Sequence, residues 1–289
     1  MNDFYIILTG ILVALSCSIL GTFLVLRKMA MVGDAISHAV LPGIVLSFFI
    51  TGSRDSIWML IGAGIMGILT TLIIEWLHKK TKLQEDASIG VTFTFLFALG
   101  VLLISYFAEN IDLDQDCVLY GEIAYVPLNT IDLLGFELPK ALVLLSIVFI
   151  GILCIIFYFF KEWMITTFDA PYAASIGMST VLWNYLLMSM VSFTTVASFE
   201  SVGAILVVAF LVVPASAAYL ITDSIKQTLL FAVAFGILSS VLGYYAASFL
   251  DVSISGSMAT VSGAIFVICF FIQWLHKQVQ KSPSILQNN

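Results

Sequence analysis

The chain has 289 residues, of which 61% are hydrophobic and 10% charged, with a formal net charge of -7 and a mean hydropathy of +1.10. Soluble globular domains carry about 25% charged residues, so this composition excludes a soluble domain. The negative net charge also argues against a nucleic-acid partner, because nucleic acids attract basic surfaces.

Nine long uncharged stretches make up most of the chain, each with about the 20 residues that a helix needs to cross a membrane. They predict an all-α polytopic membrane protein with a single domain, residues 1–289. The first stretch follows an acidic start and has full membrane length, so we expect it to be kept rather than cleaved as a signal peptide. If one of the shorter stretches does not cross fully, the number of spans is eight. The nine stretches are 4–26, 35–53, 56–74, 87–108, 141–160, 170–199, 201–222, 227–250 and 252–276.

Lysine and arginine residues predict the orientation, because they are enriched in cytoplasmic loops. If the nine spans alternate and the C-terminus is cytoplasmic, nine of the 11 basic residues lie inside, and only Arg54 and Lys140 lie outside. The N-terminus is then expected outside the cell membrane. The inner basic residues are Arg27, Lys28, Lys79, Lys80, Lys82, Lys161, Lys226, Lys277 and Lys281.

The second stretch begins with two ionisable residues, Asp34 and His38, whose spacing places them on one face of a helix. Ionisable groups inside membrane spans are costly and are therefore candidates for function. A carboxylate oxygen with an imidazole nitrogen suits manganese, iron or zinc better than magnesium or calcium. Alternatively, Asp34 stabilises the helix N-terminus and His38 donates a hydrogen bond to a neighbouring helix.

Small residues and a proline accompany this pair. Gly33, Ala35, Ala39 and Gly43 would let other helices approach closely. Pro42 predicts an interruption of the helix, which a membrane protein tolerates where the helix is packed in protein or lines a cavity.

The longest external loop, residues 109–139, is acidic and contains no lysine or arginine. A negative entrance raises the local concentration of cations, although a solvated loop that happens to be acidic would have the same composition. Its acidic residues are Glu109, Asp112, Asp114, Asp116, Glu122, Asp132 and Glu137.

Glu200 separates two stretches that would otherwise form one apolar run. It either marks the external turn between the two spans or points into a translocation path. Pro214 is expected to break its own span as Pro42 does, and paired interruptions in two halves of a chain indicate a path.

Several motifs of soluble and membrane enzymes are absent. The sequence has no G-x-x-x-x-G-K-[ST] loop, so we expect no ATPase site of this kind in the chain. It also has no H-E-x-x-H or G-x-S-x-G motif, which argues against a protease or lipid hydrolase. His78 and His276 stand at predicted cytoplasmic helix ends, where they are expected to be interfacial anchors.

Two segments resemble the membrane subunit of ABC importers for manganese, zinc or iron: residues 27–43 (RKMAMVGDAISHAVLPG) and residues 201–215 (SVGAILVVAFLVVPA). The resemblance covers essentially the whole chain and implies a permease fold like that of type II importers. It implies that Asp34 and His38 contact the metal, whereas the position of Glu200 varies within the family.

The resemblance also implies the partners. These are two cytoplasmic ATP-binding cassette subunits, an extracellular metal-binding protein and a second permease chain, either a copy or a paralogue. Residues 168–177 (FDAPYAASIG) resemble the cytoplasmic coupling segment that contacts the ATPase, with Phe168, Asp169, Ala173 and Gly177 as its marker residues.

Residues 117–124 (CVLYGEIA) resemble a loop found in manganese systems, which favours manganese over zinc or iron as the transported ion. No permanently bound cofactor is expected. Two alternatives stay open: a secondary transporter in which Asp34, His38 and Glu200 relay protons, and a metal-dependent membrane hydrolase. The hydrolase is disfavoured because a catalytic zinc site normally has three protein ligands.

Overall fold

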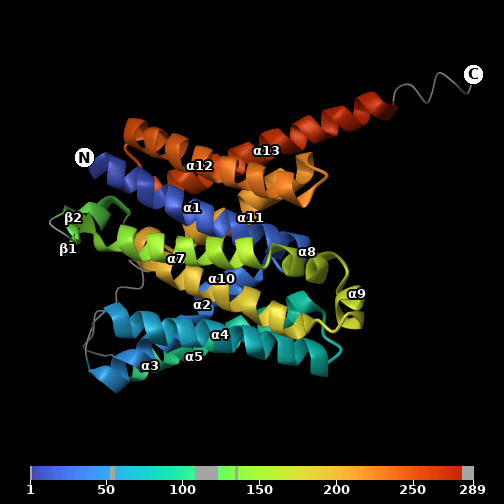
Figure 1. Ribbon diagram of the computed structural model, residues 1–289. Coiled ribbons are helices and arrows are strands. Elements are labelled where there is room, and N and C mark those ends of the chain that lie inside the picture. Colours follow the sequence, from blue (N-terminus) through green and yellow to red (C-terminus); the bar gives the residue numbers. More distant parts are fainter. Residues whose placement is uncertain (1, 53–55, 108–122, 134–135, 282–289) are drawn as a thin grey trace, which may run out of the picture.

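The structure is a computed structural model that describes residues 2–52, 56–107, 123–133 and 136–281. Long helices lie side by side and make up nearly all of it, with one short hairpin at one end (Figure 1). The predicted all-α class is therefore confirmed. The elements are α1 (Asn2–Leu26), α2 (Val32–Ala39), α3 (Leu41–Thr51), α4 (Ser56–Lys80), α5 (Glu85–Phe107), the 3-10 helix η1 (Ile123–Leu128), β1 (Thr130–Leu133), β2 (Phe136–Pro139), α7 (Lys140–Tyr158), α8 (Phe160–Phe168), α9 (Ala170–Ser175), α10 (Thr180–Val202), α11 (Ala204–Ile221), α12 (Ile225–Leu250) and α13 (Ile254–Lys281).

Within the described residues, nine helical segments are long and apolar enough to cross a membrane, as predicted. Eight of them are single helices, and the ninth, Val32–Thr51, combines α2 with α3. Some helices run beyond the uncharged stretches at their ends. For example, α4 carries His78, Lys79 and Lys80 in its last turn, where cations are favourable next to the helix C-terminus.

The first span is the centre of one group of helices. α1 packs against α7, α10, α11 and α12, while α13 covers α11 and α12. In its most apolar window 78% of α1 is buried, compared with 28% for α5. Figure 1 shows α1 running between α12 and α7. α1 is therefore the core helix of this group.

A second group contains α3, α4 and α5, which pack on one another. α2 joins the two groups, because it contacts α4 and α5 on one side and α10 and α11 on the other. The polar pair predicted on α2 therefore lies on an element between the two groups.

Glycines bring the helix backbones close together. A side chain at Gly21 on α1 would place its Cβ 1.7 Å from the carbonyl oxygen of Leu211 on α11. Gly43 on α3 and Gly62 on α4 face each other in the same way, with a Cβ on either at 2.5 and 2.6 Å from the opposite carbonyl oxygen. Close backbone approach between small residues stabilises helix pairs in membranes. The close packing predicted at Gly43 is thus present.

The two ends of the helical assembly differ. The N-terminus and the β1–β2 hairpin lie at one end, and α9 and the C-terminal end of α13 lie at the other (Figure 1). In the hairpin, Asp132 pairs directly with Glu137, so two carboxylates of the predicted acidic loop are neighbours. The other five acidic residues of that loop, Glu109, Asp112, Asp114, Asp116 and Glu122, lie outside the described residues.

Candidate functional site

Helix α2 has two distinct faces. One is buried in the protein and consists of small or branched residues, and the other carries Asp34, Ser37 and His38. The helical period produces this division, because residues four apart lie on the same side. The buried face is formed by Val32, Gly33, Ala35, Ile36 and Ala39.

Asp34 and His38 face each other across one helical turn. Their Oδ1 and Nε2 atoms are 3.7 Å apart, and each side chain is 35% exposed. Two ligand atoms of a tetrahedral zinc-sized ion lie about 3.4 Å apart, so a small movement of either side chain would let both contact one ion. The Ser37 hydroxyl donates instead to the Asp34 backbone carbonyl, at 2.6 Å. The predicted pair is therefore close enough to share a cation.

Aromatic rings on α5 flank the imidazole of His38. Its ring centroid lies 5.7 Å from that of Phe93 and 5.6 Å from that of Phe97, the latter edge-on. These contacts limit the rotation of the imidazole and lower its exposure to water. Among the described residues no group of three histidine, cysteine, aspartate or glutamate side chains could hold a metal. The pair therefore offers two ligands from this chain, which suits a transient contact better than a resident metal site.

The helix is interrupted next to the pair, as predicted from Pro42. α2 ends at Ala39, α3 begins at Leu41, and Pro42 occupies the first turn of α3. Pro42 has no N–H to donate to the His38 carbonyl one turn earlier. The interruption is slight, because Val40 keeps right-handed helical angles, with φ -68° and ψ -28°. The span therefore continues in one general direction but leaves a backbone carbonyl of the pair without its usual helical donor.

The predicted interruption at Pro214 is wrong. α11 continues through this buried proline from Ala204 to Ile221. A proline inside a helix removes one hydrogen bond, but α11 packs on α1, α12 and α13, and this packing outweighs the local penalty. The chain breaks instead at Gly203, between α10 and α11, where φ is 81°.

Glu200 does not join Asp34 and His38. It is exposed in the last turn of α10 and lines a pocket of about 190 Å³ together with Tyr125, Lys140 and Ser201. Glu200 lies at the end of the molecule that carries the hairpin, because the same pocket is lined by Asn129 and Lys140, the residues on either side of β1 and β2. This position agrees with the alternative that Glu200 marks the turn between two spans.

The predicted coupling segment, residues 168–177, forms a compact helical turn at the opposite end. The Asp169 carboxylate accepts the Tyr172 N–H at 2.9 Å and caps α9. Gly177 adopts φ 83°, and the Met178 N–H donates to the Ala173 carbonyl, so a left-handed residue ends the helix. Ala173 is buried, whereas Phe168 is 61% exposed.

Buried aromatic side chains hold the preceding helix, α8, in place. Trp163 is fully buried, and its ring lies 5.0 Å from Phe23 on α1 and 6.5 Å from Trp183 on α10. α8 is thus fixed to two membrane helices just before the exposed coupling segment begins.

Sequence reasoning missed the role of Arg27 at this end. Its guanidinium donates to Thr166 Oγ1 and Thr167 Oγ1 on α8, each at 3.1 Å, and to Asn184 Oδ1 on α10 at 3.2 Å. Burial lowers the pKa of Arg27 to about 10, which leaves it protonated at neutral pH. The one available signal was an arginine directly after an apolar span.

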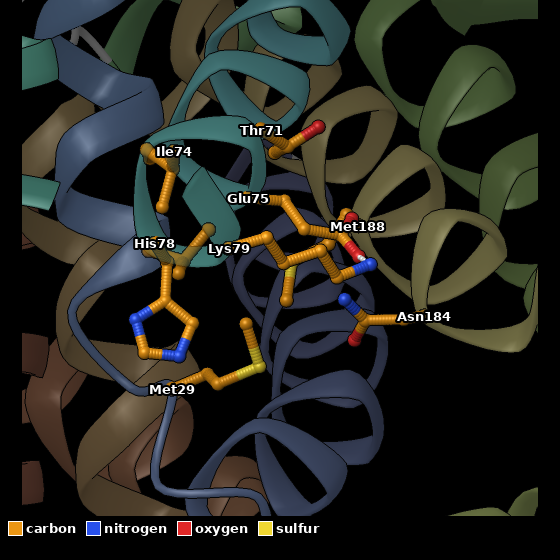
Figure 2. Close-up of a pocket in the computed structure, with 9 residues that line it drawn as sticks. Met29, Thr71, Ile74, Glu75, His78, Lys79, Asn184 and Met188 are labelled. Carbon is orange, nitrogen blue, oxygen red and sulfur yellow. Dashed lines mark hydrogen bonds and ion pairs between the residues drawn. The ribbon is translucent and has the colours of Figure 1, made fainter. Parts of the chain in front are cut away.

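A pocket of about 200 Å³ lies beside this arginine's partner Asn184 (Figure 2). Glu75 and Lys79 form an ion pair at its edge. In Figure 2 the His78 ring and the Glu75 carboxylate point to different sides, so they do not converge on a common ligand. The remaining lining residues are Met29, Val32, Thr71, Ile74 and Met188.

Residues 4–273 match the ABC 3 transport family. The chain belongs to this family. Its resemblance to ABC permeases, predicted from residues 27–43 and 201–215, is confirmed, and the protein is a multi-pass membrane component of a transporter.

Individual relatives of the ABC 3 transport family match over most of their length. The chain is 49% identical to the manganese transport system membrane protein MntD of Bacillus subtilis, over 92% of this chain and 90% of that protein. It is 40% identical to the zinc transport system membrane protein TroD of Treponema pallidum, over 96% of this chain and 75% of that protein. A solved structure, PsaBC from Streptococcus pneumoniae in complex with Fab, is 34% identical with a TM-score of 0.77, over 93% of this chain and 90% of that chain.

Proposed function

We propose that this chain is the permease subunit of an ATP-binding cassette importer that moves a divalent transition metal into the cell. The observation that carries this proposal is the Asp34–His38 pair, with its ligand atoms 3.7 Å apart on an interrupted membrane helix. In this proposal the pair contacts the ion during passage and replaces part of its water shell.

The chemistry of the pair favours a first-row transition metal. A carboxylate and an imidazole suit manganese, iron and zinc, and two ligands bind weakly enough for release. The names of the relatives support manganese first and zinc next, since the identity is 49% to MntD and 40% to TroD.

The proposed importer has further subunits. Two ATP-binding subunits would contact the coupling segment 168–177, whose exposed Phe168 and Tyr172 offer apolar contact area. An extracellular metal-binding protein would deliver the ion, and a second permease chain, a copy or a paralogue, would complete the path. The N-terminus would lie outside, because it is at the end of the helical assembly opposite α9, which carries the coupling segment that an ATP-binding subunit would contact from the cytoplasm (Figure 1).

Transport in this proposal needs two packings of the helices that differ by a few kcal/mol. Nucleotide binding to the partner subunits would shift the balance between them through the coupling segment. α2, which contacts both groups of helices, is the element whose position would change the surroundings of the pair.

The test is uptake of manganese-54 by proteoliposomes that contain the complete complex. Asp34→Ala and His38→Ala are each expected to lower uptake by about tenfold or more, because each removes one ligand from a poorly hydrated path. His276→Ala and Asp86→Ala are matched controls in exposed positions and are expected to stay within roughly twofold of wild type.

Normal uptake by correctly inserted Asp34→Ala and His38→Ala variants would contradict the assignment of the pair. Collapse of the proton gradient at constant ATP separates the proposed importer from a proton-coupled transporter. The importer continues to accumulate metal, whereas the proton-coupled transporter stops.

A further inference from the structure

Arg27 directly follows Leu26, the last residue of α1, and begins the turn that ends this helix. The Lys28 N–H donates to the Val25 carbonyl and the Met29 N–H to the Leu24 carbonyl, while Lys28 adopts a left-handed φ of 63°. This hydrogen-bond pattern fixes the direction in which the chain leaves the helix. The backbone of Arg27 is therefore firmly attached to the core helix of the molecule.

The side chain of Arg27 crosses to two other helices. Its three nitrogens donate to three neutral acceptors, namely Thr166 and Thr167 on α8 and Asn184 on α10. A planar guanidinium presents donors in a fixed fork, so it holds several acceptors in one relative arrangement. A displacement of α8 relative to α1 must break or carry along these bonds.

The two threonines directly precede the coupling segment, because Phe168 follows Thr167. The Asp169 cap then starts α9 without an intervening flexible stretch. No flexible stretch therefore separates residues 168–177 from the two hydroxyl groups that accept from Arg27.

The other end of the connection is equally short. The five residues from Arg27 to Met31 link α1 to α2, and the Val32 N–H donates to Met29 and the Ala35 N–H to Met31. Asp34 lies seven residues after Arg27. The linker thus has little slack between the arginine and the first residue of the candidate metal pair.

We propose that Arg27 is a positioning residue that transmits displacement of the coupling segment to α2 and so couples ATP hydrolysis to the exposure of Asp34 and His38. This inference rests on the proposed function. The pocket of about 200 Å³ next to Asn184 gives this junction room to rearrange, since it is lined by α4, α10 and the linker residue Met29.

The experiment measures manganese transported per ATP hydrolysed by the reconstituted complex. Arg27→Gln keeps a polar side chain but removes the charged fork. We expect it to hydrolyse ATP within roughly twofold of wild type and to transport about tenfold less manganese. Arg27→Lys keeps the charge with fewer donors, and it is expected to transport more manganese per ATP hydrolysed than Arg27→Gln but less than wild type.

Lys161→Gln is the matched control, because it removes an exposed positive charge from the same helix that carries the two threonines. Its ratio of transport to hydrolysis is expected to equal that of wild type. A second test leaves Arg27 in place: the double variant Thr166→Val and Thr167→Val removes two acceptors with side chains of similar shape, and its ratio must also fall. If Arg27→Gln does not assemble, this double variant tests the coupling role of Arg27, and a wild-type ratio would refute that role.

The outcomes separate this inference from the function on which it rests. Wild-type complex that shows no ATP-driven uptake refutes the proposed function itself. If wild type transports manganese but Arg27→Gln keeps the wild-type ratio, or loses hydrolysis and transport in equal proportion, the coupling role of Arg27 is refuted.

Discussion

Two membrane spans each contain a proline, but only one of the two spans is interrupted beside it. The span Val32–Thr51 is divided at Val40, two residues before Pro42, whereas α11 stays helical through Pro214. Both prolines are buried. Burial of the ring alone therefore does not decide whether a helix is interrupted.

The residues around each proline account for the difference. Pro42 follows a short helix with a polar face, Asp34, Ser37 and His38, which is not covered on all sides. Pro214 is preceded and followed by apolar residues that pack on three neighbouring helices. A helix that is packed over its whole length tolerates the hydrogen bond that a proline removes. A helix with partly exposed polar groups has less packing to compensate for that loss and is interrupted beside its proline.

The largest expected effect concerns the packing of α1 and α2 on Leu211, a residue of the span α11. Gly21→Val would force a side chain against the Leu211 carbonyl, which a Cβ would approach to 1.7 Å. Gly33→Ala would meet the side chain of Leu211, with Cδ1 nearest at 3.2 Å, and a side chain can move. We expect a loss of about 3 kcal/mol or more in the free energy of unfolding for Gly21→Val and under about 1 kcal/mol for Gly33→Ala. Unfolding in detergent measures both, and equal losses would contradict this account.

A smaller pair of effects concerns the turns that lead into the two spans. Gly203, before α11, has φ 81° and ψ 161°, a region open almost only to glycine. Gly203→Ala is expected to lower the free energy of unfolding by about 1–3 kcal/mol. Lys28, before α2, is strained by its positive φ of 63°, so Lys28→Gly is expected to gain up to about 1 kcal/mol. The thermal unfolding temperature is therefore expected to fall for Gly203→Ala and to rise for Lys28→Gly. Changes of the same sign in the two variants would contradict the assignment of these effects to backbone conformation in the turns.

The smallest effect on stability concerns the prolines themselves. Pro214→Ala restores an N–H for the Phe210 carbonyl but loses the packing of the ring, so we expect a change in the free energy of unfolding below about 1 kcal/mol. Pro42→Ala is expected to have a similarly small effect on stability, yet to slow manganese uptake by roughly threefold because it extends α2 into α3. Uptake by Pro214→Ala is the control. Equal uptake by Pro42→Ala and Pro214→Ala would contradict the inference that the helix interruption beside Pro42 matters for transport.

Much of the fold could be predicted from length and charge alone. The nine spans follow from the uncharged stretches, since few other structures can bury a run of that length. The Asp34–His38 contact was also predictable, because the period of a helix places such a pair on one face before any tertiary structure is known.

The remaining features depend on long-range packing that the sequence does not display. Arg27 bonds to residues 139, 140 and 157 positions away, and no local pattern specifies these partners. The rings beside His38 come from another helix, and Pro214 keeps its helix because of three others. Tertiary contacts override local preferences in each of these cases.

The buried indole of Trp163 offers a spectroscopic reporter. Of the five tryptophans, Trp58, Trp76 and Trp274 are about half exposed, whereas Trp163 is fully enclosed between Phe23 and Trp183. With the other four replaced by phenylalanine, its fluorescence would arise from a single site five residues before the segment predicted to contact the ATPase. A shift in its emission wavelength on nucleotide binding would then report a change in the surroundings of Trp163 without an attached dye.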